Sequence, residues 1–186
     1  GQVAHAEFND CSIPAKAFLY GLNAILPVSV RILRSWNVPA SFHARYSAMA
    51  REYRYFAVQG FGRDAFTDGL VTRLKEMPDL DVLNSYAVQL VGTHDFTTFA
   101  SAKDICPSKY RDIYESVFTM ERSMYGDDVL CYKVCGNAFL YHMVRSLVGT
   151  MLEMAGNGCS AAEFKDVLDS CDRRRAGKTA PSDGLY

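Results

Sequence analysis

The chain has 186 residues, of which 49% are hydrophobic, so it can bury a sizeable core and is not a generally disordered protein. The formal net charge of −1 provides no global positive field toward nucleic acid or anionic lipid, although local basic clusters can still attract them. The longest apolar run is interrupted by His142 and Arg145. We therefore expect no membrane span and no secretory signal.

Six cysteines are spread over the chain, at positions 11, 106, 131, 135, 159 and 171. They contain no C-x-x-C pair, and none of the four histidines lies at a zinc-finger spacing. Cys131 and Cys135 would share one face of a strand, as core thiols often do. We expect reduced thiols, no metal site and a cytoplasmic location.

Periodic hydrophobic patterns predict four elements in the first third of the chain. Alternating residues predict strands at residues 1–8, 28–38 and 45–58, and helical spacing predicts a helix at residues 14–26. A boundary is expected near Pro39, because proline has no N–H for a strand ladder and small residues follow it.

The remainder of the chain predicts helices mixed with one hairpin. Helices are expected at residues 80–91, 136–158 and 161–168, the last with Ser160 and Glu163 as a capping box. Alternating runs at residues 113–124 and 129–135, joined through “YGDD”, predict a hairpin, whereas residues 93–104 are expected to be a loop or short helix. This order predicts an α+β fold with a mixed, largely antiparallel sheet and helices packed on one face.

The helix expected at residues 136–158 carries Arg145 beside its apolar stripe, one turn before Gly149. Its polar face is expected to hold His142, Ser146, Thr150 and Glu153. Two hypotheses remain open for Arg145. In the first, the aliphatic part of its side chain covers apolar surface while the guanidinium reaches water. In the second, the guanidinium pairs with a carboxylate on a chain segment that approaches at Gly149.

Six motifs carry a resemblance to a known family: “GQVAH”, “LNAILP”, “FHARYSAMAREYRY”, “VGTHDFTTF”, “GNAFLYHMVRSLVGTMLE” and “GKTAPSDGLY”. In this order they are similar to the tRNA pseudouridine synthase A family, over residues 1–186. The resemblance implies isomerisation of uridine to pseudouridine in the anticodon stem-loop of tRNA, at tRNA positions 38–40, without a cofactor or metal. It also implies a homodimer that binds tRNA across both subunits, with residues 1–40 as the C-terminal half of an N-terminal α/β domain and residues 41–186 as a C-terminal α/β domain.

The resemblance further implies an aspartate nucleophile in a motif G-R-T-D-A-G-V-H immediately before “GQVAH”. We therefore expect this chain to lack the nucleophile and to be inactive alone. The sequence “GRDA” at residues 62–65 is similar, but it lacks the threonine and the second glycine and follows the strand of Tyr53. Asp64 is therefore interpreted as a loop residue and not as the nucleophile.

Three residues match the family's active site. The resemblance implies that Arg145 pairs with the catalytic aspartate, that Tyr53 packs against the extruded base and assists proton removal, and that Leu185 lines the base pocket. Without the resemblance, Tyr53 would be a half-buried strand aromatic and Leu185 an unstructured terminal residue.

Basic residues outside this group are candidates for RNA contact. Arg45, Lys109 and Arg111 match basic positions of the family and are expected at RNA phosphates, with a solvated arginine as the alternative for Arg45. The run at residues 173–175 is interpreted as solvated. A non-catalytic RNA-binding module is the alternative function for the whole chain.

Overall fold

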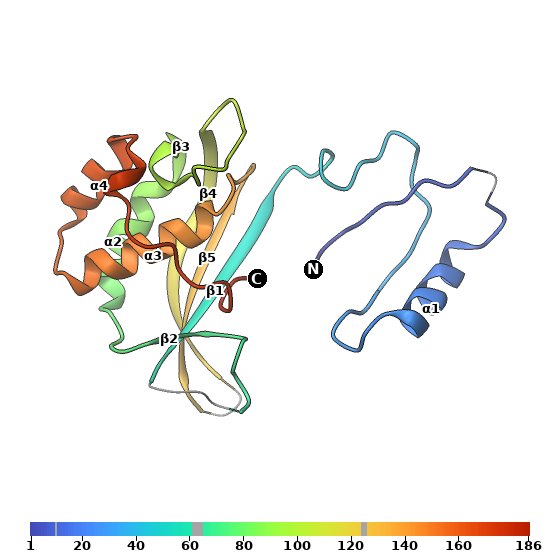
Figure 1. The fold of residues 1–186 in the computed structure, drawn as a ribbon, viewed down its shortest axis with the longest axis horizontal. Coiled ribbons are helices and arrows are strands. Elements are labelled where there is room, and N and C mark those ends of the chain that lie inside the picture. The colour runs from blue at the N-terminus through green and yellow to red at the C-terminus, as the bar shows by residue number, and fades with distance from the viewer. Residues whose placement is uncertain (10, 61–64, 124–125) are drawn as a thin grey trace. The chain divides into compact units, whose positions relative to one another are not determined.

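The computed structural model describes residues 1–9, 11–60, 65–123 and 126–186. Two compact units divide the chain, Gly1–Met49 and Ala50–Tyr186, and Figure 1 shows their elements. Asp64 lies outside the described residues, so its interpretation as a loop residue stays untested. The assignment of residues 1–40 and 41–186 to two domains likewise stays a prediction.

The first unit contains α1 (Ala15–Ile25), which confirms the helix expected at residues 14–26. The strands expected at residues 1–8 and 28–38 do not form among the described residues. Alternation yields a strand only where a neighbouring strand bonds the backbone, and no such neighbour occurs in the described part of this unit. Asn23 instead fixes the second segment, since its side chain donates to Ile32 O and accepts from Ile32 N, both at 2.9 Å.

The second unit is built on a sheet of five strands in its described part, in the order β2-β1-β5-β4-β3. The strands are β1 (Arg51–Gln59), β2 (Thr72–Leu74), β3 (Gly92–Asp95), β4 (Tyr110–Arg122) and β5 (Asp128–Gly136). All neighbours are antiparallel except β1 and β2, which are parallel. The expected hairpin is confirmed as β4 and β5, although part of its “YGDD” connection lies outside the described residues. A strand, β3, stands where a loop or short helix was expected.

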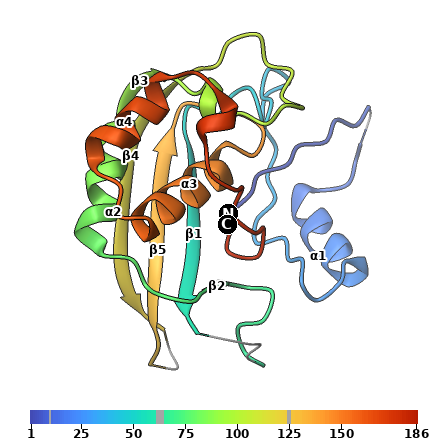
Figure 2. The ribbon, with the colours of Figure 1, turned by 60° about the vertical axis from the view of Figure 1, so that its left-hand side comes forward.

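Helices cover one face of this sheet, as Figure 2 shows. They are α2 (Leu80–Ala87) with the 3-10 turn η1 (Val88–Leu90), α3 (Met143–Gly156) and α4 (Ala161–Asp169), while the 3-10 turns η2 (Thr97–Phe99) and η3 (Arg173–Arg175) lie in the connections. The α+β prediction is confirmed, and so is the capping box of Ser160 and Glu163. No helix in the described part of the chain is both long enough and apolar enough to cross a membrane.

The helix α3 differs from its prediction in two ways. It begins at Met143 instead of near Gly136, because Gly136 ends β5 and His142 adopts a left-handed backbone with φ of 62°. Ser146 and Thr150, expected on an exposed polar face, are 1% and 0% exposed. The reason is tertiary: the C-terminal segment covers this face, and Gly177 N donates to Thr150 Oγ1 at 3.0 Å.

This C-terminal segment, residues 177–186 (hereafter the tail), joins α3 to β1. Ala180 N donates to Arg145 O at 3.0 Å, and Tyr186 exchanges two backbone hydrogen bonds of 2.8 Å with Arg54. Gly149 permits the approach, since a Cβ there would lie 1.8 Å from Lys178 O. A chain segment does approach at Gly149, and it is the chain's own tail. Arg145 meets a backbone carbonyl of this segment, so its pairing with a carboxylate stays a prediction.

The buried carboxylate of Asp104 links the loop between η2 and β4 to the residues before α3 through hydrogen bonds. This carboxylate accepts from Lys109 Nζ at 2.6 Å, Cys106 N at 2.9 Å and Tyr141 N at 2.6 Å. Burial alone would raise the pKa of Asp104, but these three donors outweigh it and lower the pKa to about 2. Asp104 thus stabilises the start of α3 as a charged group.

Replacing Gly149 by alanine should displace the tail, because the new methyl group would overlap the carbonyl of Lys178. We expect the free energy of unfolding to fall by roughly 1–3 kcal/mol in urea denaturation followed by circular dichroism. Gly156→Ala is the matched control on the same helix, since a Cβ there meets nothing within 4 Å. It should leave stability unchanged or raised by up to about 1 kcal/mol. Equal stability of the two variants would contradict this role for Gly149.

Replacing Asp104 by asparagine should lower the free energy of unfolding at neutral pH, because Lys109 loses its partner. The folded pKa of about 2 lies below the unfolded value. The carboxylate therefore stabilises the fold above about pH 4, and this stabilisation is lost as the pH falls toward about 2. The difference between wild type and Asp104→Asn should accordingly shrink on acidification. The exposed pair of Lys165 and Asp169 supplies the control, Asp169→Asn, which should change stability by under about 1 kcal/mol. A difference for Asp104→Asn that does not depend on pH would refute the assignment.

Candidate functional site

The guanidinium of Arg145 is oriented by the tail. Arg145 Nε donates to Ala180 O at 2.7 Å, and Ala180 N donates back to Arg145 O, so one residue of α3 and one of the tail bond reciprocally. The side chain is partly buried, and it forms no ion pair with any carboxylate among the described residues. A guanidinium that was only solvated would not need this hydrogen bond to Ala180 O. The Nη atoms remain able to bind an anionic partner.

Tyr53 lies on the helix-covered face of β1 and is partly buried against the core. Its ring meets Phe139 edge to face, with centroids 5.1 Å apart and planes at 83°. Such a contact fixes the orientation of an aromatic ring that is still open on another side. Phe139 was missed in the sequence because it was counted within the helix, although it belongs to the loop before α3.

Leu185 belongs to the tail and forms an isolated antiparallel bridge with Tyr55. It is partly buried against the core, so it is not an unstructured terminal residue. Gly184 allows this pairing, because a Cβ there would lie 2.4 Å from Phe56 O. Leu185 therefore lies at the edge of β1, the strand that carries Tyr53.

Tyr55 connects the three candidate active-site residues. Its buried hydroxyl hydrogen-bonds to Thr72 Oγ1 and donates to Pro181 O at 3.0 Å. Burial raises the pKa of Tyr55, whereas the bond with Thr72 and the positive charge of Arg145 act in the opposite direction. The tail thus brings together Arg145, the strand of Tyr53 and Leu185.

The three basic candidates make contacts of their own. Arg45 is exposed in the unit Gly1–Met49, with its guanidinium 6.0 Å from the ring centre of Tyr46. Lys109 bonds to Asp104, and Arg111 Nη1 donates to the carbonyls of Ser108 and Tyr110 at 3.0 and 2.6 Å. Lys109 and Arg111 lie where the chain enters β4.

The run at residues 173–175 divides into two kinds of side chain. Arg174 is 90% exposed and pairs with Asp172 at 2.8 Å, as expected for a solvated run. Arg173 is partly buried and donates to Thr179 Oγ1 at 3.2 Å and to Gly177 O at 3.4 Å. The solvated interpretation is therefore wrong for Arg173, because the tail folds over it. No group of three or more His, Cys, Asp or Glu able to hold a metal occurs among the described residues.

Comparison with known proteins identifies the family of the chain. The profile of a family described as tRNA pseudouridine synthase matches residues 86–186, which include α3 and the tail. The chain is 38% identical over 185 residues to the tRNA pseudouridine synthase A of Halalkalibacterium halodurans, and 38% identical over 186 residues to that of Bacillus subtilis. The alignments cover all of this chain but 68% and 73% of those relatives. The chain therefore belongs to the tRNA pseudouridine synthase family.

Proposed function

We propose that the chain is part of an enzyme that isomerises uridine to pseudouridine in the anticodon stem-loop of tRNA. In this reaction the glycosidic bond from the ribose to the base nitrogen breaks, and a bond from the ribose to a ring carbon forms. The ring carbon loses its proton, and the released nitrogen gains one. Atoms and electrons balance without a co-reactant. The observation that carries the proposal is the convergence of Arg145, the strand of Tyr53 and Leu185 through the tail.

The proposal gives each of these residues one role. The base must leave the RNA stack to be reached, and the ring of Tyr53, supported by Phe139, offers a surface for it to pack against. Leu185 provides an apolar wall beside that strand. Tyr53 also has a hydroxyl that can assist removal of the proton from the ring carbon.

Arg145 is proposed to hold the nucleophilic aspartate. A guanidinium next to a carboxylate lowers the pKa of the carboxylate and keeps it ionised, the state needed for attack on the sugar or base. Because Nε is engaged with Ala180 O, the Nη atoms are the ones that would bind the carboxylate. The partly buried setting strengthens this attraction relative to water.

The aspartate itself is proposed to lie in the family motif that the resemblance puts before Gly1. On this proposal the 186 residues alone bind tRNA but do not turn it over. We further propose that the enzyme acts as a cytoplasmic homodimer, and that Arg45, Lys109 and Arg111 contact tRNA phosphates.

The experiment is tritium release from uridine-labelled tRNA, measured for the 186-residue chain and for a protein extended by the aspartate motif. We expect turnover only from the extended protein. Turnover by the 186 residues would show that the nucleophile lies within them. An extended protein that binds tRNA without turnover would favour a non-catalytic RNA-binding module.

In the extended protein, Arg145→Met should lower turnover at pH 7 by on the order of a hundredfold, as loss of a preorganised charge partner commonly does. Methionine keeps much of the packing but leaves the aspartate with a raised pKa. Part of the loss should therefore return at higher pH, while tRNA affinity changes little. A pH–rate profile checks this, and turnover within a few-fold of wild type at pH 7 would reduce Arg145 to a residue that covers its helix.

Loss of Lys109 or Arg111 should weaken tRNA binding through the salt-dependent part of the affinity. Each alanine variant should reduce the slope of log affinity against log salt by about one unit, because one phosphate contact disappears. Lys165→Ala, which removes an exposed charge on α4, is the control and should leave the slope unchanged. Slopes equal to wild type in both variants would remove these residues from the RNA-binding surface.

A further inference from the structure

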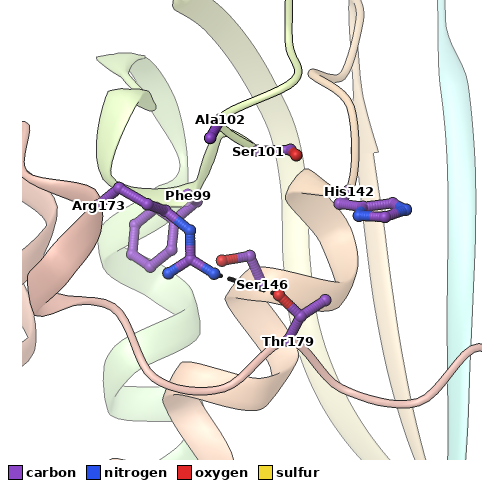
Figure 3. A pocket seen from close by; sticks show the side chains of 7 residues that line it. All are labelled: Phe99, Ser101, Ala102, His142, Ser146, Arg173 and Thr179. Carbon is purple, nitrogen blue, oxygen red and sulfur yellow. Dashed lines mark hydrogen bonds between the residues drawn. The ribbon is translucent and has the colours of Figure 1, made fainter.

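A cavity of about 250 Å³ lies beside the first turn of α3, between the residues after η2 and the tail (Figure 3). Phe99 and Ala102 form an apolar part of its lining. Its lining includes the hydroxyls of Ser101, Ser146 and Thr179, the imidazole of His142 and the guanidinium of Arg173. None of the residues that line it is acidic. This cavity is distinct from the candidate active site, whose residues Arg145, Tyr53 and Leu185 are not part of its lining.

The hydroxyl of Ser146 borders this cavity without a hydrogen-bond partner among the described residues. Ser146 is 1% exposed, so bulk water does not satisfy its hydroxyl freely. Leaving a buried hydroxyl unbonded costs about 1–3 kcal/mol. Such a group in a native fold calls for an explanation, and a ligand in the cavity supplies one.

Arg173 brings a positive charge to the same cavity. It donates hydrogen bonds to two neutral oxygens of the tail, Thr179 Oγ1 and Gly177 O, and it has no ion-pair partner within the described ranges. The neighbouring Arg174 is neutralised by Asp172. Figure 3 shows the guanidinium of Arg173 on the same side of α3 as the Ser146 side chain. A planar cation held in this way presents its remaining N–H groups to an oxyanion.

The start of α3 adds further donors and a favourable dipole. This helix has 14 residues, and its N-cap, His142, contributes no side-chain cap. The first-turn N–H groups of such a helix carry partial positive charge and favour anions.

We propose that this cavity binds a phosphate group. A water molecule takes up about 30 Å³, so the cavity has the space of about eight waters, more than one tetrahedral oxyanion needs. Arg173 supplies the charge, Ser146 and the first turn of α3 supply hydrogen bonds, and the absence of acidic lining residues avoids repulsion. This group is either a backbone phosphate of bound RNA or inorganic phosphate from solution. The first possibility rests on the proposed function, and the second does not.

The first arm of the test uses inorganic phosphate and the 186-residue chain, labelled with ¹⁵N. We expect saturable chemical-shift changes in the amides around His142 and Ser146, at matched ionic strength in chloride. Arg173→Gln should weaken this binding by about tenfold or more, as loss of a charge-assisted hydrogen bond does. Arg174→Gln is the matched control, because it removes the same charge one residue away and outside the cavity.

A second variant, Ser146→Ala, guards against misfolding as an explanation. Removing a buried hydroxyl that has no partner should leave stability unchanged or raise it, while phosphate binding weakens several-fold. No saturable shifts at these amides, or equal weakening by Arg173→Gln and Arg174→Gln, would overturn the proposal. This arm needs neither RNA nor turnover, so its failure is distinguishable from failure of the proposed function.

The second arm identifies the source of the phosphate by fluorescence anisotropy with labelled tRNA. If RNA supplies the phosphate, Arg173→Gln weakens tRNA binding more than Arg174→Gln does. It also reduces the slope of log tRNA affinity against log salt by about one unit more than Arg174→Gln does. In that case inorganic phosphate displaces tRNA more strongly than chloride does at the same ionic strength. Equal tRNA affinities of the two variants, together with phosphate binding in the first arm, support free phosphate as the ligand.

Discussion

The reciprocal hydrogen bonds between Arg145 and Ala180 are the interaction on which the site depends. An arginine on a helix border would ordinarily sample many rotamers, because its side chain carries about 2 kcal/mol of rotamer entropy. The bond from Nε to Ala180 O removes much of that freedom. The same tail residue accepts and donates, so its position and the direction of the guanidinium are set together.

The remainder of the tail extends this constraint to the sheet. Its backbone pairs with β1 through Tyr186 and Arg54, and glycines at positions 149 and 184 make the two close approaches possible. The tail also buries Thr150 and folds over Arg173. Its Ala180 orients Arg145 of the candidate active site, and its Thr179 lines the cavity that we propose to bind phosphate. A single segment of ten residues therefore forms part of both.

Local patterns predicted much of this fold correctly from the sequence. The capping box at Ser160, the hairpin of β4 and β5 and the close approach at Gly149 each depend on few residues or on one steric requirement. The assignment of Arg145, Tyr53 and Leu185 to the active site came from the resemblance and stays a prediction. Periodicity alone left Arg145 undecided, because the residue that orients it lies 35 positions later in the chain.

What the sequence did not predict depends on contacts between distant segments. Ser146 and Thr150 look like a solvated helix face until the tail covers them. Arg173 looks like its neighbours until its bonds to the tail are known. The alternating residues 28–38 do not form a strand, because alternation specifies a face but not the partner strand that must satisfy the backbone.

Hydrogen exchange at the tail amides tests the central claim most directly, because it reports whether the tail is fixed to both α3 and β1. The account predicts that Ala180 N–H, bonded to Arg145 O, and Tyr186 N–H, bonded to Arg54 O, exchange slowly. Both should be slowed on the order of a thousandfold relative to a free peptide, which places them with the cooperatively folded part of the molecule. Exchange of these two amides at the rate of an unstructured peptide, while β5 remains protected, would contradict the account.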